Sequence, residues 1–169
     1  MWSLVSMWLG DTPRAVELLN GAKTAAHASI CEQIARNGSL PAEEARVNSI
    51  GYVLMDMRGL LNLAQASRFP PFVASGGARD VGDLYSFVCP SGASIRATLD
   101  YLLPYAVGER PWPYPSETAD YSGAVPLFKQ GAVVWHSAAY AGAAARIKGA
   151  SDTDLSELWW RAPSAAVAA

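Results

Sequence analysis

Apolar residues recur at three- and four-residue steps along several long segments of this chain, and this spacing restricts its possible folds more than any other feature. Such a period places the apolar side chains along one face of a helix. The clearest stripe comprises Ile50, Val53, Leu54, Met57, Leu60, Leu61 and Ala64. No stretch alternates with a period of two, so the sequence predicts an all-α fold built from helical hairpins.

A first helix is expected from Pro13 to about Arg36. Thr12 is suited to cap it, Pro13 fits the first helical position, and Asn37-Gly38 would end it. Its apolar stripe comprises Val16, Leu19, Ala22, Ala26, Ile30 and Ile34. We therefore expect one continuous core helix over this segment.

Later helices follow from the same signals. Pro90-Ser91-Gly92 precedes a helix that should close at Pro104-Tyr105. Its stripe comprises Ile95, Leu99, Leu102 and Leu103. The Ala-rich segment from about 126 to 148 reads as one helix, and 152–160 reads as a short last helix. We expect one domain over residues 1–162, followed by a frayed tail over 163–169.

Composition excludes several classes of function. The 169 residues carry a net charge of −2, and the Lys and Arg residues are scattered, so a nucleic-acid partner held through its phosphates is not expected. No apolar run approaches the roughly 18 residues of a membrane-spanning helix, so no membrane partner is expected either.

Cys31 and Cys89 are the two cysteines of the chain. Two thiols do not reach a four-ligand zinc site, and no cluster of His, Asp and Cys demands a metal, so no cofactor is expected. The cysteines could pair in an exported protein, but the sequence favours two small buried side chains without a bond between them.

Three blocks of sequence carry a family resemblance. The first, residues 38–52, reads GSLPAEEARVNSIGY; the second runs from Asp83-Leu84-Tyr85 through Gly92-Ala93-Ser94-Ile95 to the segment 99–105; and the third is Trp112-Pro113-Tyr114. In this order and spacing they resemble the alginate lyase superfamily. Leu40, Glu44 and Val47 depart from the family's usual residues.

The resemblance implies part of an (α/α) toroid that cleaves a uronic-acid polysaccharide, such as alginate, by β-elimination. Carried over to this sequence, it makes Tyr52 the catalytic acid or acid/base and Arg46 the cation that holds the uronate carboxylate or the charged form of the tyrosine. Six residues separate the two, which would put them on different faces of one unbroken helix. Their joint action therefore requires a break near Asn48.

Each candidate also has a structural interpretation. Tyr52 could be a rim residue with its hydroxyl in water, and Arg46 could form an ordinary surface pair with Glu43. Trp112 and Tyr114 could stack on sugar rings, or Trp112 could plug the end of a hairpin. The weaker cleft candidates are Glu43, Asn48 and Arg58, while His27 and His136 are interpreted as core histidines.

The family usually carries an Asn-His pair just before a Trp-containing helix, and this chain starts with Met1-Trp2, about where that helix would begin. We therefore expect a fragment without the principal base, inactive alone and prone to self-association. The residues after Met1 read poorly as a signal peptide. A periplasmic or secreted location is implied by the family only. The alternative function is a non-catalytic carbohydrate-binding or structural helical remnant.

Overall fold

The fold is described by a computed structural model, which describes residues 11–24, 29–68, 82–117 and 119–147. Every regular element in these ranges is a helix, as predicted. The helices are α2 (Thr12–Thr24), α3 (Ile30–Gln33), α4 (Pro41–Glu44), α5 (Ser49–Ser67), α7 (Ile95–Ala106), the 3₁₀ helix η1 (Ser122–Ala124), α8 (Val125–Val134) and α9 (Ala138–Arg146). None of the helices in this part of the chain is long and apolar enough to cross a membrane.

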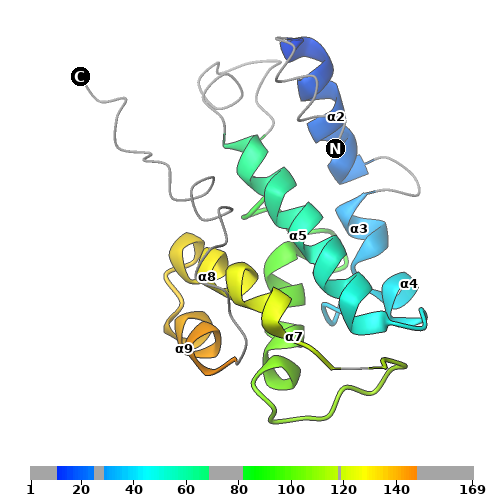
Figure 1. Ribbon diagram of the computed structural model, residues 1–169. Helices are drawn as coiled ribbons and strands as arrows, with labels where there is room; N and C mark the ends of the chain where they lie inside the picture. The colour runs from blue at the N-terminus through cyan, green and yellow to red at the C-terminus, as the bar shows by residue number, and fades with distance from the viewer. Residues whose placement is uncertain (1–10, 25–28, 69–81, 118, 148–169) are drawn as a thin grey trace.

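Helix α5 is the centre of the fold, with α3 and α4 on one side and α8 and α9 on the other (Figure 1). It contacts α4, α7, η1 and α8. The apolar stripe predicted for it is buried throughout: Ile50, Val53, Leu54, Met57, Leu60, Leu61 and Ala64 are all at most 8% exposed. Burial of this stripe stabilises the fold, because apolar area removed from water contributes about 25 cal/mol per Å².

The expected continuous helix from Pro13 to Arg36 is wrong. Helix α2 ends at Thr24, Ser29 is extended with φ −80° and ψ 154°, and α3 lasts only to Gln33. Ile34 is extended as well, and the backbone N–H of Ala35 then donates to the carbonyl of Ser39 at 2.9 Å. The described residues of the apolar stripe are still buried on both sides of the break: Val16, Leu19 and Ala22 before it, and Ile30 and Ile34 after it. Ala26 lies outside the described residues.

The start of α2 also differs in detail from the prediction. Asp11 caps the helix, since its Oδ1 accepts the backbone N–H of Arg14 at 3.1 Å. Thr12 already belongs to α2. An aspartate is as good a capping residue as a threonine, so the local sequence allowed either.

The expected single helix over 126–148 is also wrong. Helix α8 ends at Val134, His136 has a left-handed φ of 50°, and the Ser137 side chain caps α9 by accepting the N–H of Tyr140. The break lets α9 fold back against α8 near Gly131, where an added Cβ would lie 3.0 Å from the ring of Tyr140 in α9. The third predicted helix is present as α7, and it continues past Pro104 to Ala106.

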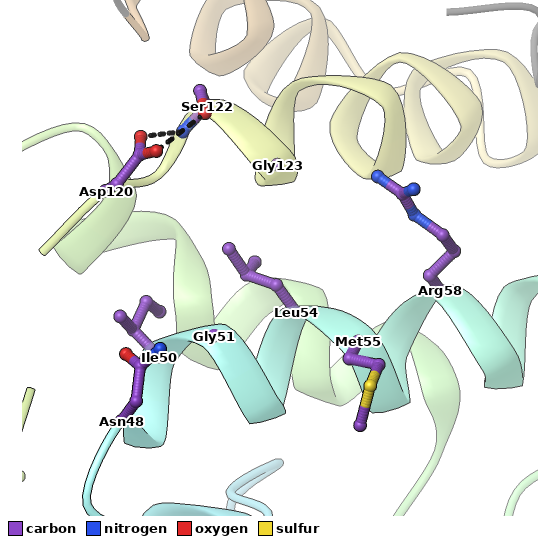
Figure 2. A pocket seen from close by; sticks show the side chains of 9 residues that line it. All are labelled: Asn48, Ile50, Gly51, Leu54, Met55, Arg58, Asp120, Ser122 and Gly123. Atoms are coloured by element: carbon purple, nitrogen blue, oxygen red, sulfur yellow. Dashed lines mark hydrogen bonds between the residues drawn. The ribbon is translucent and has the colours of Figure 1, made fainter.

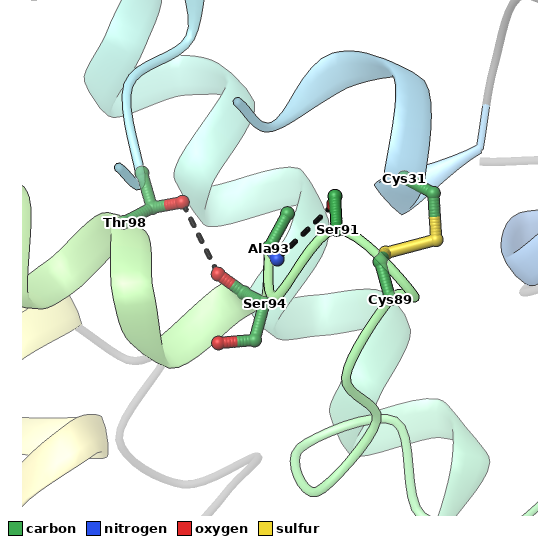
Figure 3. The surroundings of a disulfide bond; sticks show 6 residues. All are labelled: Cys31, Cys89, Ser91, Ala93, Ser94 and Thr98. Atoms are coloured by element: carbon green, nitrogen blue, oxygen red, sulfur yellow. Dashed lines mark hydrogen bonds between the residues drawn. A yellow bond between two sulfur atoms is a disulfide. The ribbon is translucent and has the colours of Figure 1, made fainter. Parts of the chain in front are cut away.

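Cys31 and Cys89 form a disulfide, which corrects the expectation of two unbonded thiols. The bond joins α3 to the loop that leads into α7 (Figure 3). That loop is folded tightly around it, because the N–H of Cys89 donates to Ala93 and the N–H of Gly92 donates to Cys89. The sequence could not show that two cysteines 58 residues apart lie face to face. The predicted last helix, 152–160, lies outside the described residues.

Candidate functional site

The candidate catalytic residues meet at the corner between α4 and α5. Pro41 begins α4, Glu44 ends it, and Asn48 has a non-helical backbone with φ −111° and ψ 63° before α5 starts at Ser49. The chain therefore has the break near Asn48 that joint action of Arg46 and Tyr52 requires. Arg46 lies in the turn, while Tyr52 lies in the first turn of α5, with its N–H donating to the carbonyl of Asn48.

Arg46 lies over the ring of Tyr52. Its guanidinium carbon is 3.7 Å from the centroid of the tyrosine ring, the geometry of a cation–π contact. The same guanidinium is 3.6 Å from the carboxylate of Glu43. The pair with Glu43 and the contact with Tyr52 thus coexist. Because the Arg46 side chain keeps 49% of its surface exposed, its remaining N–H groups are open to a ligand.

Two carboxyl groups lie beside this pair. One oxygen of Glu43, Oε2, is buried without a hydrogen-bond partner among the described residues. Burial, and secondly the negative charge of Glu43, raise the pKa of Asp56 above its usual value. Asp56 follows Tyr52 by four residues on α5, so both face the same side of the helix. We call Glu43, Arg46, Tyr52 and Asp56 the corner cluster.

The Trp112 loop is fastened to the start of α5. The indole N–H of Trp112 donates to the Ser49 hydroxyl at 2.7 Å, and that hydroxyl donates to the carbonyl of Pro115 at 2.7 Å. The N–H of Ser49 donates to the same carbonyl, and the Ser116 hydroxyl donates to Asn48 Oδ1 at 3.1 Å. These bonds tie the loop to the residues that separate Arg46 from Tyr52.

Trp112 is surrounded by tyrosines. Its ring makes edge-to-face contacts with Tyr105 at 5.1 Å, Tyr114 at 5.3 Å and Tyr101 at 6.4 Å between centroids. With its N–H bonded and its ring packed in this group, Trp112 has the geometry of a plug. Tyr114 lies at the edge of the group, with its hydroxyl 3.5 Å from that of Tyr101.

Tyr101 and Glu44 form the inner side of this aromatic group. Burial raises the pKa of Tyr101 far above its usual value, helped by the hydrogen bond with Tyr114 and the charge of Glu44. Glu44 is 3% exposed, and its Oε1 accepts the backbone N–H of Leu40 at 3.2 Å. Glu44, a departure from the family's pattern, therefore fixes the start of α4 and faces away from the solvent side of the corner.

A cavity of about 430 Å³ lies between α5 and η1 (Figure 2). Its lining residues are Asn48, Ile50, Gly51, Leu54, Met55, Arg58, Asp120, Ser122 and Gly123. Of the residues predicted for the site, Asn48 and Arg58 line this cavity. Arg46, Tyr52, Glu43, Trp112 and Tyr114 do not. The structure thus divides the candidates into a corner cluster, an aromatic loop and a cavity, which share Asn48 as a common border.

Sequence reasoning missed three of these polar residues. Asp56 could have been found from its four-residue spacing to Tyr52. Asp120 and Ser122 gave no usable signal, because they lie more than 50 residues after the end of α5 and only the tertiary fold brings them to the cavity.

The histidines give no support for a second catalytic centre in the described ranges. His136 is exposed in the turn between α8 and α9, so its interpretation as a core residue is wrong. His27 lies outside the described residues. Within the described ranges, no group of three or more His, Cys, Asp or Glu side chains could hold a metal ion.

Comparisons with known proteins identify the family and the fold of the chain. The family model named alginate lyase matches residues 4–112, which is more than half of the chain, so the protein belongs to the alginate lyase family. The crystal structure of an alginate lyase from Bacteroides ovatus is similar to this chain, with a TM-score of 0.74 and 20% identity. No curated protein matched the chain.

The structural match covers 94% of this chain and 39% of the Bacteroides protein. The chain therefore has the all-helical fold of part of an (α/α) toroid. It spans well under half the length of the solved structure that it resembles.

Proposed function

We propose that this chain is the part of a polysaccharide lyase that supplies the acid/base tyrosine and its neighbouring cation, and that its substrate is a polymer of uronic acids such as alginate. Family membership supports the general class of activity. The observation that carries the specific proposal is the contact of Arg46 with Tyr52, at 3.7 Å, on the solvent side of the α4–α5 corner.

The reaction is a β-elimination. A base takes the C5 proton of a uronate, and the electron pair of that C–H bond forms the C4–C5 double bond. The C4–O bond breaks, and the leaving oxygen receives a proton. Tyr52 donates that proton from its phenol. If its phenolate also takes the C5 proton, the same proton passes through Tyr52 to the leaving oxygen, and the step balances without another reactant.

Arg46 stabilises the negative charge that develops next to C5. Loss of the C5 proton moves electron density toward the substrate carboxylate, and a guanidinium fork can bind both carboxylate oxygens. The contacts with Tyr52 and Glu43 hold the side chain in one orientation before substrate arrives, which reduces the entropy lost on binding. Glu43 and Asn48 position Arg46 and the turn that carries it.

The disulfide supports a periplasmic or secreted location for the protein. Disulfides form and persist in oxidising compartments and are rare in the cytosol. A polysaccharide substrate also lies outside the cytosol, where an exported enzyme can bind it. We therefore propose export, on the Cys31–Cys89 bond and the chemistry of the substrate.

The proposal is tested by the ultraviolet absorbance of the unsaturated sugar that β-elimination produces, with alginate and glucuronan as substrates. We propose that the chain alone gives little product, because it covers 39% of the similar Bacteroides chain, and that a longer form carrying further toroid helices gives product. In the active form, Tyr52→Phe should reduce the rate by about a hundredfold or more, the scale of lost acid/base catalysis.

Tyr105→Phe is the matched control, because it removes one hydroxyl from a partly buried ring outside the corner cluster. It should leave the rate within about twofold, which is well under 1 kcal/mol in the barrier. No product from either form would overturn the lyase proposal and favour a sugar-binding or structural helical protein. Product from Tyr52→Phe at the normal rate would remove Tyr52 from the mechanism.

A further inference from the structure

Two glycines widen the cavity between α5 and η1. Gly51 on α5 and Gly123 in η1 both line it, so neither element projects a side chain from these two positions. Ile50 and Leu54 provide apolar surface from α5. A volume of about 430 Å³ lies within the range of roughly 300–1,000 Å³ that is typical of small-ligand sites.

The two charged side chains of the cavity lie at opposite ends. Figure 2 shows Arg58 at one end, with Asp120 and Asn48 at the other. Among the described residues, nothing forms an ion pair, hydrogen bond or ring contact with the Arg58 side chain. A guanidinium without a carboxylate partner attracts an anion, and its planar fork suits a carboxylate.

Asp120 defines the other end. Its two oxygens accept the N–H of Ser122 at 2.8 Å and the hydroxyl of Ser122 at 3.0 Å. These bonds lower the pKa of Asp120, so it is ionised at neutral pH. It repels a carboxylate and accepts hydrogen bonds from hydroxyl groups. The cavity thus suits a ligand with a carboxylate at one end and hydroxyls at the other.

We propose that this cavity is a subsite for one uronate residue of the polymer, with the sugar carboxylate at Arg58 and the sugar hydroxyls at Asp120 and Asn48. The inference rests on the proposed function, because it takes the substrate class from there. It adds a specificity-determining residue, Arg58, outside the corner cluster.

The cavity borders the corner cluster at the start of α5. Asn48 lines the cavity and lies in the chain between Arg46 and Tyr52. A rise of about 1.5 Å per residue puts Arg58 about 9 Å further along α5 than Tyr52. Gly51, next to Tyr52, is a lining residue as well. Six residues of one unbroken helix also turn by about 240°, so the cavity and the corner cluster lie on different faces of α5. The cavity therefore suits a sugar of the polymer other than the one at Tyr52.

The test measures binding of mannuronate oligosaccharides to the whole chain by calorimetry, together with the amide NMR shifts of Gly51 and Gly123. A neutral mannose oligosaccharide of equal length is the second probe. Arg58→Gln should weaken mannuronate binding by about tenfold or more, equal to about 1.4 kcal/mol. In this variant the amide resonances of Gly51 and Gly123 should no longer change when mannuronate is added. Arg36→Gln, at another exposed arginine, should leave the affinity within about twofold.

The outcomes separate the subsite from the proposed function. If the unaltered chain binds no uronate oligosaccharide, the substrate class of the proposed function fails and the subsite fails with it. If mannuronate binds, but Arg58→Gln binds it equally well or Gly123 does not shift, the subsite alone is overturned. Equal affinity for the neutral oligosaccharide would overturn the role of Arg58 as the carboxylate ligand.

Discussion

The guanidinium of Arg46 lies over the ring of Tyr52, with 3.7 Å between its carbon and the ring centroid, and the helix break at Asn48 between the two residues allows this contact. The contact depends on the planar shape of the guanidinium, because an ammonium group neither stacks in this way nor forks around a carboxylate. The two side chains therefore act as one unit.

Arg46→Lys tests this unit, since it keeps the positive charge and removes the plane. We expect product formation in the active form to fall by about tenfold or more, equivalent to about 1.4 kcal/mol in the barrier. The melting temperature should change little, because an exposed cation–π contact contributes about 0.5–1 kcal/mol. Arg36→Lys is the control, and unchanged activity of Arg46→Lys would show that charge alone suffices.

Ser49→Ala tests how the Trp112 loop is held. The substitution removes the acceptor of the indole N–H and a donor to Pro115 while leaving every aromatic ring in place. We expect a loss of about 1–3 kcal/mol in the free energy of unfolding, because buried polar groups lose their partners. Urea unfolding measures this loss.

Ser86→Ala is the control for that experiment, since it removes one hydroxyl bond, to the carbonyl of Asp83, in an exposed turn. Its effect should stay within about 0.5 kcal/mol. Equal effects of the two substitutions would mean that the bonds of Ser49 do not hold the loop, and the plug interpretation of Trp112 would lose its support.

Asp56→Asn tests the electrostatics of the corner cluster. Burial and Glu43 raise the pKa of Asp56, so the folded chain binds this proton more readily than the unfolded chain does. Stability therefore decreases as the pH rises from the usual Asp pKa through the raised one. Asn carries no charge, so the variant should melt at a higher temperature at neutral pH, and this gain should vanish below the usual Asp pKa.

Glu117→Gln, at an exposed position of the loop after Trp112, should show no such pH-dependent gain. A gain for Asp56→Asn that persists unchanged at acidic pH would have a cause other than the charge of Asp56.

The Cys31–Cys89 bond should contribute strongly to stability. It closes a loop of 58 residues, and loop entropy alone predicts about 4 kcal/mol of stabilisation. A variant with both Cys31→Ser and Cys89→Ser should therefore unfold at lower urea concentration, and a reducing agent should affect the natural chain only. Equal stability of the natural chain with and without reductant would show that the disulfide does not stabilise the fold.

Gly38 and Gly59 provide a matched pair of glycines with opposite expectations. A Cβ on Gly38 would lie 2.1 Å from the carbonyl oxygen of Ala97, and its φ is +89°. Gly38→Ala should therefore cost at least about 2 kcal/mol. Gly59 lies inside α5 with nothing within 4 Å of an added Cβ. Gly59→Ala should stabilise the chain by about 0.5–1 kcal/mol. Thermal unfolding compares the two, and equal effects would contradict the packing at Gly38.

The sequence by itself determined the helical class and the buried face of α5. A period of three to four residues reports which side chains must leave water, whichever segment covers them, so Ile50, Met57 and Leu61 were predicted correctly. The family pattern supplied Arg46 and Tyr52, and simple helix geometry required the break at Asn48 that the structure contains.

Only the tertiary structure decided the interruptions and the long-range pairs. The apolar stripe runs from Val16 to Ile34 without a visible break in the sequence, yet α2 ends at Thr24 and Ser29 is extended. The turn at His136 depends on the packing of α9 against α8. The Cys31–Cys89 bond, the Trp112–Ser49 hydrogen bond and the approach of Asp120 to α5 join residues 58 or more positions apart. No local pattern encodes such contacts, because they arise when separate buried faces pack together and bring distant loops to the same place.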